Sequence, residues 1–324
     1  MPQDAAIPFL LGVNYPWLNY AHDFGEGPWG HRGISAPENQ SRVTQDFAEI
    51  RDSGATTVRW FLFGDGRAGF LTEEGIPRKP DAFLFKDVDA VLSLAANCDL
   101  KLCFSLIDFL WLQDHGGKRV GHANELMLQF AAGREAFLEH ILIPLFREFR
   151  AHPALFAWEI ANEPEWAIRE FHRERSAKMH LADFRVFATE VAQAVHEFGE
   201  VPVTLGSARL QWVHAWHEIG LDFYQAHYYP ATEGDTIANL GKQLAALPAL
   251  DKPLVLGELP ARDASADYSL EKALDECRDA GVHGAAVWRW TKPEETASDV
   301  AVGVVEPATL RAWADERRAR EAGA

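Results

Sequence analysis

Cysteine is scarce in this sequence, with three residues among 324. The three, Cys98, Cys103 and Cys277, are odd in number, and two of them lie in apolar surroundings. We therefore expect buried free thiols and no disulfide framework. A cysteine-based metal site would need closer clusters with histidine partners, which the sequence lacks, so no metal centre is predicted.

Basic residues are also few, with 31 Lys and Arg against 48 Asp and Glu, and the formal net charge is −17. This balance argues against nucleic acid and anionic membrane surfaces as partners. No apolar stretch approaches the ~18 residues of a membrane span. The N-terminal residues 1–8 have no basic segment ahead of their short apolar run and do not resemble a secretory signal. We expect a soluble, cytoplasmic protein.

Short apolar, β-branched segments alternate with helix-like amphipathic segments along the chain. Strands are predicted at 9–15, 56–63, 100–108, 155–164, 201–206, 223–229, 253–260 and 284–290. Helices are predicted at 43–53, 85–97, 126–150, 179–198, 210–219, 236–247, 270–280 and 307–322. Pro144 is expected to kink or split the third helix.

This alternation predicts a parallel sheet, and the continuously apolar strands predict burial on both of its faces. Eight strand–helix units over this length are typical of an α/β fold of the (β/α)8 TIM barrel type, here a single domain over residues 1–324. An open doubly wound sheet is the competing interpretation. In a barrel, the functional site lies at the C-terminal ends of the strands.

Two of the predicted strands end on a glutamate. The fourth ends in Asn162-Glu163-Pro164, where the proline is expected to hold Glu163 in an extended conformation. The seventh ends near Glu258. Two carboxylates at neighbouring tips are what acid-assisted cleavage of a glycosidic bond requires, with retention of configuration at a separation of roughly 5–5.5 Å and inversion at a wider one. The alternative is that each glutamate merely caps the helix that follows.

In this interpretation Glu163 is the general acid/base, which needs a raised pKa, and Glu258 is the nucleophile. Asn162 could hydrogen-bond a sugar hydroxyl. Arg59 lies inside the second strand, where a charge is costly unless paired; it could orient Glu258 and keep it ionised, or form a purely structural ion pair.

Aromatic residues and histidines at other strand tips suggest a sugar site. His227 and Tyr229 share one face of the sixth strand and could hold the nucleophile and a sugar hydroxyl, although His227 could also be a core residue. Trp288 and Trp290 share a face of the eighth strand and could offer a flat surface to a pyranose, or could pack in the core. Loop residues are candidates for further subsites or for ordinary loop packing: Trp17, Tyr20, His22, Trp29, His31, Glu165, Trp166, Arg169 and His172.

An ordered set of motifs carries a family resemblance. The set Val58-Arg59, Asn162-Glu163-Pro164, His227-Tyr228-Tyr229, Gly257-Glu258 and Trp288-Arg289-Trp290 resembles glycoside hydrolase family 5 and the wider clan A of retaining glycosidases. The resemblance implies Glu163 as acid/base and Glu258 as nucleophile. It also implies a sugar site lined by Arg59, His227, Tyr229 and Trp288, with Trp290 as a candidate for the last place.

One position departs from the family pattern. Many members carry a histidine at the end of the third strand, where this chain has Asp108. Asp108 could bind a sugar hydroxyl or pair with Arg59. Members without that histidine include mannan-acting enzymes, so the resemblance favours β-mannosidic substrates.

The predicted function is a retaining O-glycosyl hydrolase that acts on β-linked oligosaccharides or glycosides without a cofactor. A β-glucosidase or β-glucanase of the same clan, and a barrel that binds carbohydrate without cleaving it, are the alternatives. Long loops after the first and fourth strands favour short oligosaccharides or exo-action.

The residues Gly64–Gly69 spell G-x-G-x-x-G, but loop-forming residues follow where a dinucleotide site needs a helix.

Overall fold

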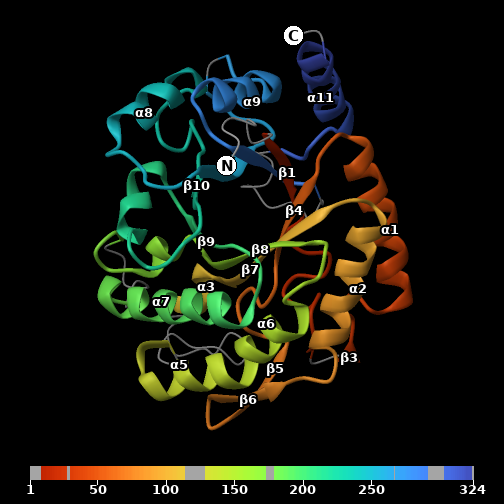
Figure 1. The fold of residues 1–324 in the computed structure, drawn as a ribbon, viewed down its shortest axis with the longest axis vertical. Helices are drawn as coiled ribbons and strands as arrows, with labels where there is room; N and C mark the ends of the chain where they lie inside the picture. Colours follow the sequence, from red (N-terminus) through yellow and green to blue (C-terminus); the bar gives the residue numbers. More distant parts are fainter. Residues whose placement is uncertain are drawn as a thin grey trace, which may run out of the picture.

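Eight parallel strands form a closed barrel in the computed structural model, which describes residues 9–27, 30–113, 128–172, 179–265, 267–290 and 303–322. The strands are β1 (Leu10–Asn14), β4 (Thr57–Phe61), β7 (Lys101–Asp108), β8 (Leu155–Asn162), β9 (Val203–Ser207), β10 (Tyr224–His227), β11 (Leu254–Pro260) and β12 (Gly284–Trp288). Each pairs with its neighbour in chain order, and β12 closes the barrel on β1 (Figure 1). The predicted (β/α)8 barrel is confirmed, and an open sheet is excluded.

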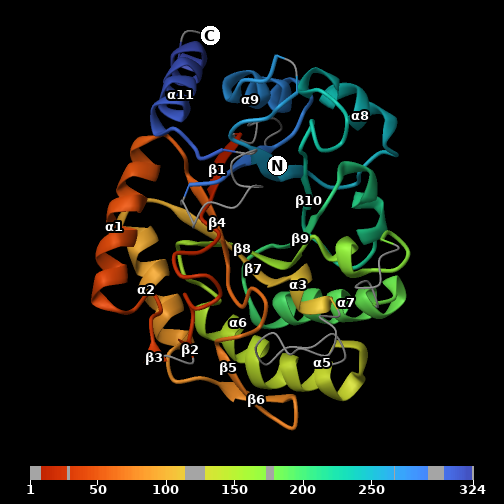
Figure 2. The same ribbon diagram turned by 180° about the vertical axis from the view of Figure 1, so that it is seen from behind.

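Helices surround the barrel, as both ribbon views show (Figures 1 and 2). They are α1 (Pro37–Asp52), α2 (Leu84–Asn97), α3 (Phe109–Leu112), α5 (Ala131–Phe137), α6 (Ile143–Phe149), α7 (Leu181–Phe198), α8 (Leu240–Ala246), α9 (Leu270–Asp279) and α11 (Pro307–Ala322). Their apolar faces pack on the outer side of the strands in one continuous buried core. Because the strands are covered on both faces, their sequences are apolar without alternation.

The long helix around Pro144 differs from the prediction in how it accommodates the proline. From residue 131 it continues through α5, a π-helical turn at Leu138–Leu142, and α6. The Ile143 N–H bonds to the Leu138 carbonyl, five residues back. The wider turn places Pro144, which has no N–H to offer, in the first turn of α6, so the helix changes register and neither ends nor splits.

Other boundaries also shift. Helix α1 begins at Pro37, earlier than predicted, because a proline in the first turn loses no intrahelical hydrogen bond. The segment Leu210–Trp216 is a 3-10 helix, and a second 3-10 turn, Ile237–Asn239, leads into α8.

An antiparallel hairpin, β5 (Phe70–Glu73) with β6 (Ile76–Pro80), occupies a segment predicted as loop. It is fixed by Phe70, whose ring stacks on Trp111 with centroids 5.6 Å apart. Since a strand follows Gly64–Gly69 where a dinucleotide site would need a helix, the glycine pattern is not a nucleotide-binding motif. A second short hairpin, β2 (Glu26–Gly27) with β3 (Gly30–His31), lies in the loop after β1.

The three cysteines are free thiols, as predicted, and two of them, Cys103 and Cys277, are buried. Within the described ranges, every helix is too short or too polar to cross a bilayer.

Candidate active site

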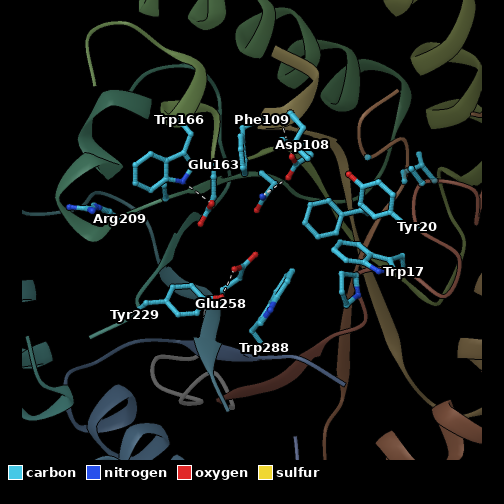
Figure 3. Close-up of a pocket in the computed structure, with 18 of the residues that line it drawn as sticks. Trp17, Tyr20, Asp108, Phe109, Glu163, Trp166, Arg209, Tyr229, Glu258 and Trp288 are labelled. Carbon is cyan, nitrogen blue, oxygen red and sulfur yellow. Dashed lines mark hydrogen bonds between the residues drawn. The ribbon is translucent and has the colours of Figure 1, made fainter. Parts of the chain in front are cut away.

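A cavity of about 440 Å³ opens at the C-terminal ends of the barrel strands, a size typical of small-ligand sites. Its aromatic lining consists of Trp17, Tyr20, Phe61, Phe109, Trp166, Tyr229 and Trp288. Its polar lining includes Asp108, Asn162, Glu163, Arg209, Thr232, Glu233 and Glu258. Figure 3 shows the carboxylates of Glu163 and Glu258 turned toward the middle of this cavity, between walls of aromatic rings.

The two glutamates lie close together. Glu163 directly follows β8, and Glu258 lies within β11. One oxygen of each carboxylate and one ring nitrogen of His227 all lie within 4.8 Å of one another. This short separation corresponds to the geometry of retaining glycosidases, because an inverting pair needs room for a water molecule between the carboxylates.

Glu163 adopts a backbone conformation that the sequence did not predict. Its φ of 48° and ψ of 45° lie in the left-handed region, so the expectation of an extended residue before Pro164 was wrong. The Glu163 N–H donates to the Gly206 carbonyl of β9 at 2.7 Å, which ties the tip of β8 to its neighbour. Left-handed backbone is uncommon for a glutamate and is typical of positions where a turn is held by its surroundings.

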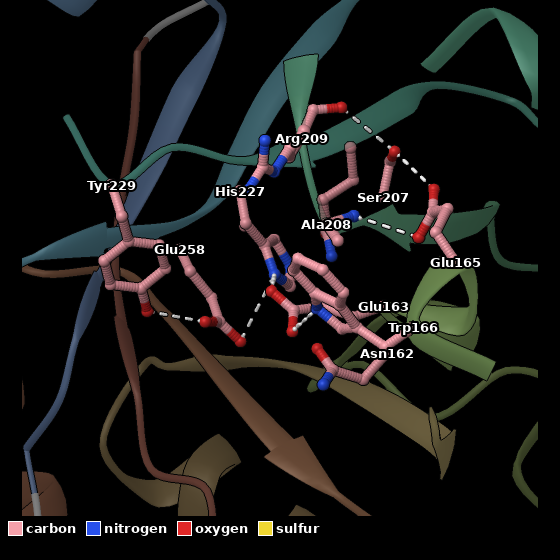
Figure 4. Close-up of polar contacts among 12 residues, drawn as sticks. Asn162, Glu163, Glu165, Trp166, Ser207, Ala208, Arg209, His227, Tyr229 and Glu258 are labelled. Atoms are coloured by element: carbon pink, nitrogen blue, oxygen red, sulfur yellow. Dashed lines mark hydrogen bonds and ion pairs between the residues drawn. The ribbon is translucent and has the colours of Figure 1, made fainter. Parts of the chain in front are cut away.

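The surroundings of the Glu163 side chain favour its protonated form. Burial raises its pKa to about 7, although a hydrogen bond from Trp166 Nε1 to Oε2, at 2.9 Å, acts in the opposite direction. His227 Nδ1 lies 2.7 Å from Glu163 Oε1. Burial also lowers the pKa of His227 to about 4, so this imidazole is neutral at pH 7. Figure 4 shows the contacts of the His227 ring with Glu163 and Glu258.

Glu258 has different partners. Arg59 Nη1 donates to its Oε1 at 2.8 Å, and the Tyr229 hydroxyl donates to its Oε2 at 2.6 Å. Burial raises the pKa of Glu258 and the Glu163 carboxylate adds to that rise, while His227, the Arg59 charge and the Tyr229 hydrogen bond oppose it. Both hydrogen bonds favour the carboxylate, as a nucleophile requires.

Asp108 and Asn162 form a pair at the ends of adjacent strands. Asn162 Nδ2 donates to Asp108 Oδ2 at 2.7 Å, while Asn162 Oδ1 accepts from Arg59 Nη2 at 2.7 Å. Asp108 also caps α3 through the Leu110 N–H, and burial raises its pKa to about 7. It makes no ion pair with Arg59, so that alternative was wrong; Asn162 stands between the two side chains.

The predicted tryptophans line two different pockets. Trp17, Trp166 and Trp288 line the main cavity. Trp290, predicted as an alternative to Trp288, instead lines a second pocket beside α1 and the start of α11, where its side chain is buried. His227 lies beneath the cavity floor, reaching it through Glu163.

Among the loop candidates, Tyr20 also faces the cavity, whereas His22, His31, Arg169 and His172 are not part of its lining. Trp29 lies outside the described residues. Glu165 is fully buried and accepts hydrogen bonds from Ser207, the Ala208 N–H and Trp216, which makes it a structural anchor for the turn after β8.

Sequence reasoning missed two residues near the site. Arg209 follows β9 and places its guanidinium over the rings of Trp166 and Trp212, at 5.5 and 5.1 Å from their centroids. Glu159 lies in the middle of β8 and is fully buried against Arg59. A signal for Glu159 was present, because a buried arginine requires a buried partner and Trp158-Glu159-Ile160 places an acid inside an apolar strand.

Glu163, His227 and Glu258 are the described residues close enough together to share a metal ion. Arg59 Nη1 already donates to Glu258 Oε1 at 2.8 Å, which places a positive charge beside this group. The arrangement fits an acid/base pair with its supporting imidazole.

Comparison with known proteins gives relatives of one kind, although no family model matches the chain. The mannan endo-1,4-beta-mannosidase of Mytilus edulis is 28% identical over 170 residues, which cover 50% of this chain and 41% of that protein. The enzyme of the same name from Cryptopygus antarcticus is 21% identical over 334 aligned residues, covering 87% of this chain and 80% of that protein. The chain thus matches about two fifths of the length of the mussel relative.

Solved structures with the same fold include the beta-mannanase of the blue mussel Mytilus edulis. It superposes with a TM-score of 0.73 at 22% identity, over 95% of this chain and 91% of that one. The comparisons therefore confirm the barrel fold, and the names of the sequence relatives agree with the resemblance to β-glycoside hydrolases.

Proposed function

We propose that this protein is a retaining β-mannanase, which hydrolyses β-1,4-linked mannan or manno-oligosaccharides by double displacement. The observation that carries the proposal is the close pair of carboxylates at the tips of β8 and β11, one held by a cation and the other with its pKa raised to about 7. Such a pair supplies a charged nucleophile and a protonated acid at the same pH.

In the first step, Glu258 Oε attacks the anomeric carbon and forms a glycosyl ester, while the bond to the leaving oxygen breaks. Glu163 gives its proton to that oxygen. In the second step, Glu163, now ionised, takes a proton from water, whose oxygen displaces Glu258 and restores both carboxyl groups. Two inversions return the anomeric carbon to its original configuration.

The walls of the cavity suit a sugar chain. Trp17 and Trp288 pack edge to face with centroids 6.4 Å apart and leave ring surface on the cavity wall. Flat aromatic surfaces stack on the C–H faces of pyranoses, while Asp108 and Asn162 offer polar atoms for ring hydroxyls. Trp166 and Arg209 lie on the Glu163 side, where the leaving sugar would depart (Figure 3).

The mannose preference is supported by the names of the relatives and by the absence of the strand-three histidine. The loops after β1 and β8 suggested short substrates or exo-action, whereas the names of the relatives specify endo-action. We propose internal cleavage of the mannan chain. A cytoplasmic location stays a prediction from the sequence.

The test is hydrolysis of linear β-1,4-mannan, manno-oligosaccharides, cello-oligosaccharides and aryl β-glycosides, with the anomer of the first product followed by NMR. We expect cleavage of the mannose series and initial formation of the β-anomer. Turnover of the glucose series alone would indicate the β-glucanase alternative, and an initial α-anomer would exclude double displacement. Binding without any cleavage would support the non-catalytic barrel.

A further inference from the structure

A buried polar layer lies directly beneath the candidate active site, and Arg59 of β4 is at its centre. Its guanidinium has five N–H groups, and each has an acceptor. Nε and Nη2 donate to Glu159 Oε2 and Oε1, both at 2.6 Å. The remaining three donate to Asn14 Oδ1 at 2.9 Å, Glu258 Oε1 at 2.8 Å and Asn162 Oδ1 at 2.7 Å. The orientation of this one side chain therefore determines the positions of Glu258 and Asn162.

Glu159 fixes that orientation. Besides the two bonds from Arg59, it accepts from Ser105 Oγ at 2.9 Å and from Gln225 Nε2 at 2.6 Å. Its two oxygens thus receive four hydrogen bonds, and the side chain is fully buried. A bidentate contact with a carboxylate locks the plane of a guanidinium, which a single contact cannot do.

The surrounding backbone leaves space for this arrangement. A Cβ atom on Gly206 of β9 would lie 2.7 Å from Glu159 Oε1, and one on Gly257 of β11 would lie 2.5 Å from Gln225 Nε2. Any larger residue at either position would displace the polar layer. Strands β9 and β11, which lie on either side of β10, therefore carry no side chain at the points where their backbones approach Glu159 and Gln225.

We propose that Glu159 is a positioning residue for the reaction. It orients the guanidinium of Arg59, which in turn holds the nucleophile Glu258. Its negative charge also offsets the positive charge of Arg59, so that Arg59 does not weaken proton binding by Glu163 and Glu258. The inference rests on the proposed glycosidase function. Glu159 does not line the cavity and would act only through Arg59.

The charge balance gives the proposal a measurable consequence. The titratable groups that interact directly with Glu159 are Arg59, Cys103, Glu163 and His227, and Glu258 is linked to it through Arg59. Burial is the main reason for the raised pKa of Glu163, and the negative charge of Glu159 contributes to it, whereas Arg59 acts against it. Without the Glu159 charge, Arg59 would lower the pKa of Glu163 and of Glu258.

The first variant is Glu159→Gln, in wild-type background, assayed on manno-oligosaccharides across the pH range. An amide can accept from only one side of the guanidinium fork, so Arg59 must tilt, and we expect kcat/KM at the optimum to fall about 10- to 100-fold. We also expect both limbs of the pH profile to move about one pH unit toward acid. A profile with wild-type limbs would overturn the role in charge balance.

The second variant, Glu159→Asp, keeps the charge but withdraws the carboxylate by one methylene. We expect the limbs of its pH profile to stay at their wild-type positions, while kcat/KM falls about tenfold or more. Wild-type kcat/KM in this variant would overturn the positioning role. Because Glu159→Asp leaves no unpaired cation in the core, it tests the proposal even if Glu159→Gln does not fold.

Asp46→Asn is a matched control. Asp46 is also a buried acid paired with an arginine, Arg42, at 2.9 Å, but it lies on α1, outside the cavity. We expect it to lower the melting temperature and to leave the pH profile unchanged. If this control shifts the profile like Glu159→Gln, the effect is structural and the proposal fails. Wild-type protein that does not cleave any glycoside would instead refute the proposed function.

Discussion

Glu163 and Glu258 are the same type of residue, reach the same cavity and belong to strands of one barrel, yet their partners differ. Glu258 accepts from a guanidinium and a phenol, whereas Glu163 accepts from an indole N–H; the neutral imidazole of His227 lies 2.7 Å from Glu163 and 3.5 Å from Glu258. The side chain of Glu258 is the less exposed of the two, at 6% against 16%. Burial disfavours the charged form of both, so the difference in role comes from the charge of the hydrogen-bond donor.

The comparison predicts the largest effect for Glu258→Gln. An amide cannot form the glycosyl ester, so kcat on manno-oligosaccharides should fall about 10⁴-fold or more. The measurement is initial rate against wild type, with the melting temperature as a check on folding. Residual activity within tenfold of wild type would show that another group is the nucleophile.

Glu163→Gln should have a smaller effect that depends on the substrate. Loss of a general acid costs about 10²- to 10⁴-fold on a sugar leaving group. The first step with an activated aryl β-mannoside should suffer less, because its leaving group needs no proton. The glycosyl-enzyme should then accumulate.

The same variant allows a sharper distinction between the two acids. A small anionic nucleophile such as azide needs no general base, so it should restore turnover of the aryl substrate by Glu163→Gln and leave Glu258→Gln inactive. The anomer of the product decides the assignment: a β-glycosyl azide from Glu163→Gln means that azide attacked the glycosyl-enzyme, whereas an α-glycosyl azide from that variant would mean direct displacement and would make Glu163 the nucleophile.

The fold was predictable because the barrel repeats one simple pattern. Each strand is an apolar segment of a length typical of strands, and each is followed by a helical or turn segment. Local departures were not predictable, since they depend on contacts from elsewhere in the chain. The left-handed Glu163 is anchored to β9, so there a tertiary contact overrides the local preference. The π-helical turn before Pro144 has a local cause, the missing N–H of the proline, but local rules do not distinguish a wider turn from a kink or a break.

The site was predictable where residues lie at strand tips, because parallel strands bring their C-terminal ends together. Sequence spacing could not decide which of Trp288 and Trp290 lines the cavity, since that depends on how the chain leaves β12. The sequence also offered Asp108 as a possible partner of Arg59, and missed Glu159, which is its actual ion-pair partner. Which residues of different strands become neighbours inside a barrel depends on the stagger of the strands, which the sequence does not show. Glu159 lies at the same level along the barrel axis as Arg59, whereas Asp108 lies nearer the C-terminal ends of the strands.

Tyr229→Phe tests the hydrogen bond that the Tyr229 hydroxyl donates to Glu258. The variant keeps the ring and removes the O–H that donates to Glu258 Oε2. A hydrogen bond to a charged group is worth about 1.5–3 kcal/mol, so kcat/KM should fall about 10- to 100-fold. Because that bond lowers the pKa of Glu258, its loss should move the acid limb of the pH profile upward. An acid limb that stays in place would show that the Tyr229 hydrogen bond is not needed to keep Glu258 ionised.

Trp166→Phe tests the hydrogen bond that the Trp166 indole N–H donates to Glu163, and it should have the smallest effect. In the wild type, the alkaline limb should lie near pH 7, because Glu163 must be protonated and its pKa is about 7. The indole N–H stabilises the carboxylate, so its removal should raise that pKa and move the alkaline limb up by about 0.4–1 pH unit. At pH 8 the variant should then retain a larger share of its optimal kcat/KM than the wild type does. Trp17→Phe, an indole change on the opposite wall, is the control that should leave the limb unmoved (Figure 3); an equal shift in both variants would mean that wall packing, and not the donor to Glu163, sets the pKa of the acid.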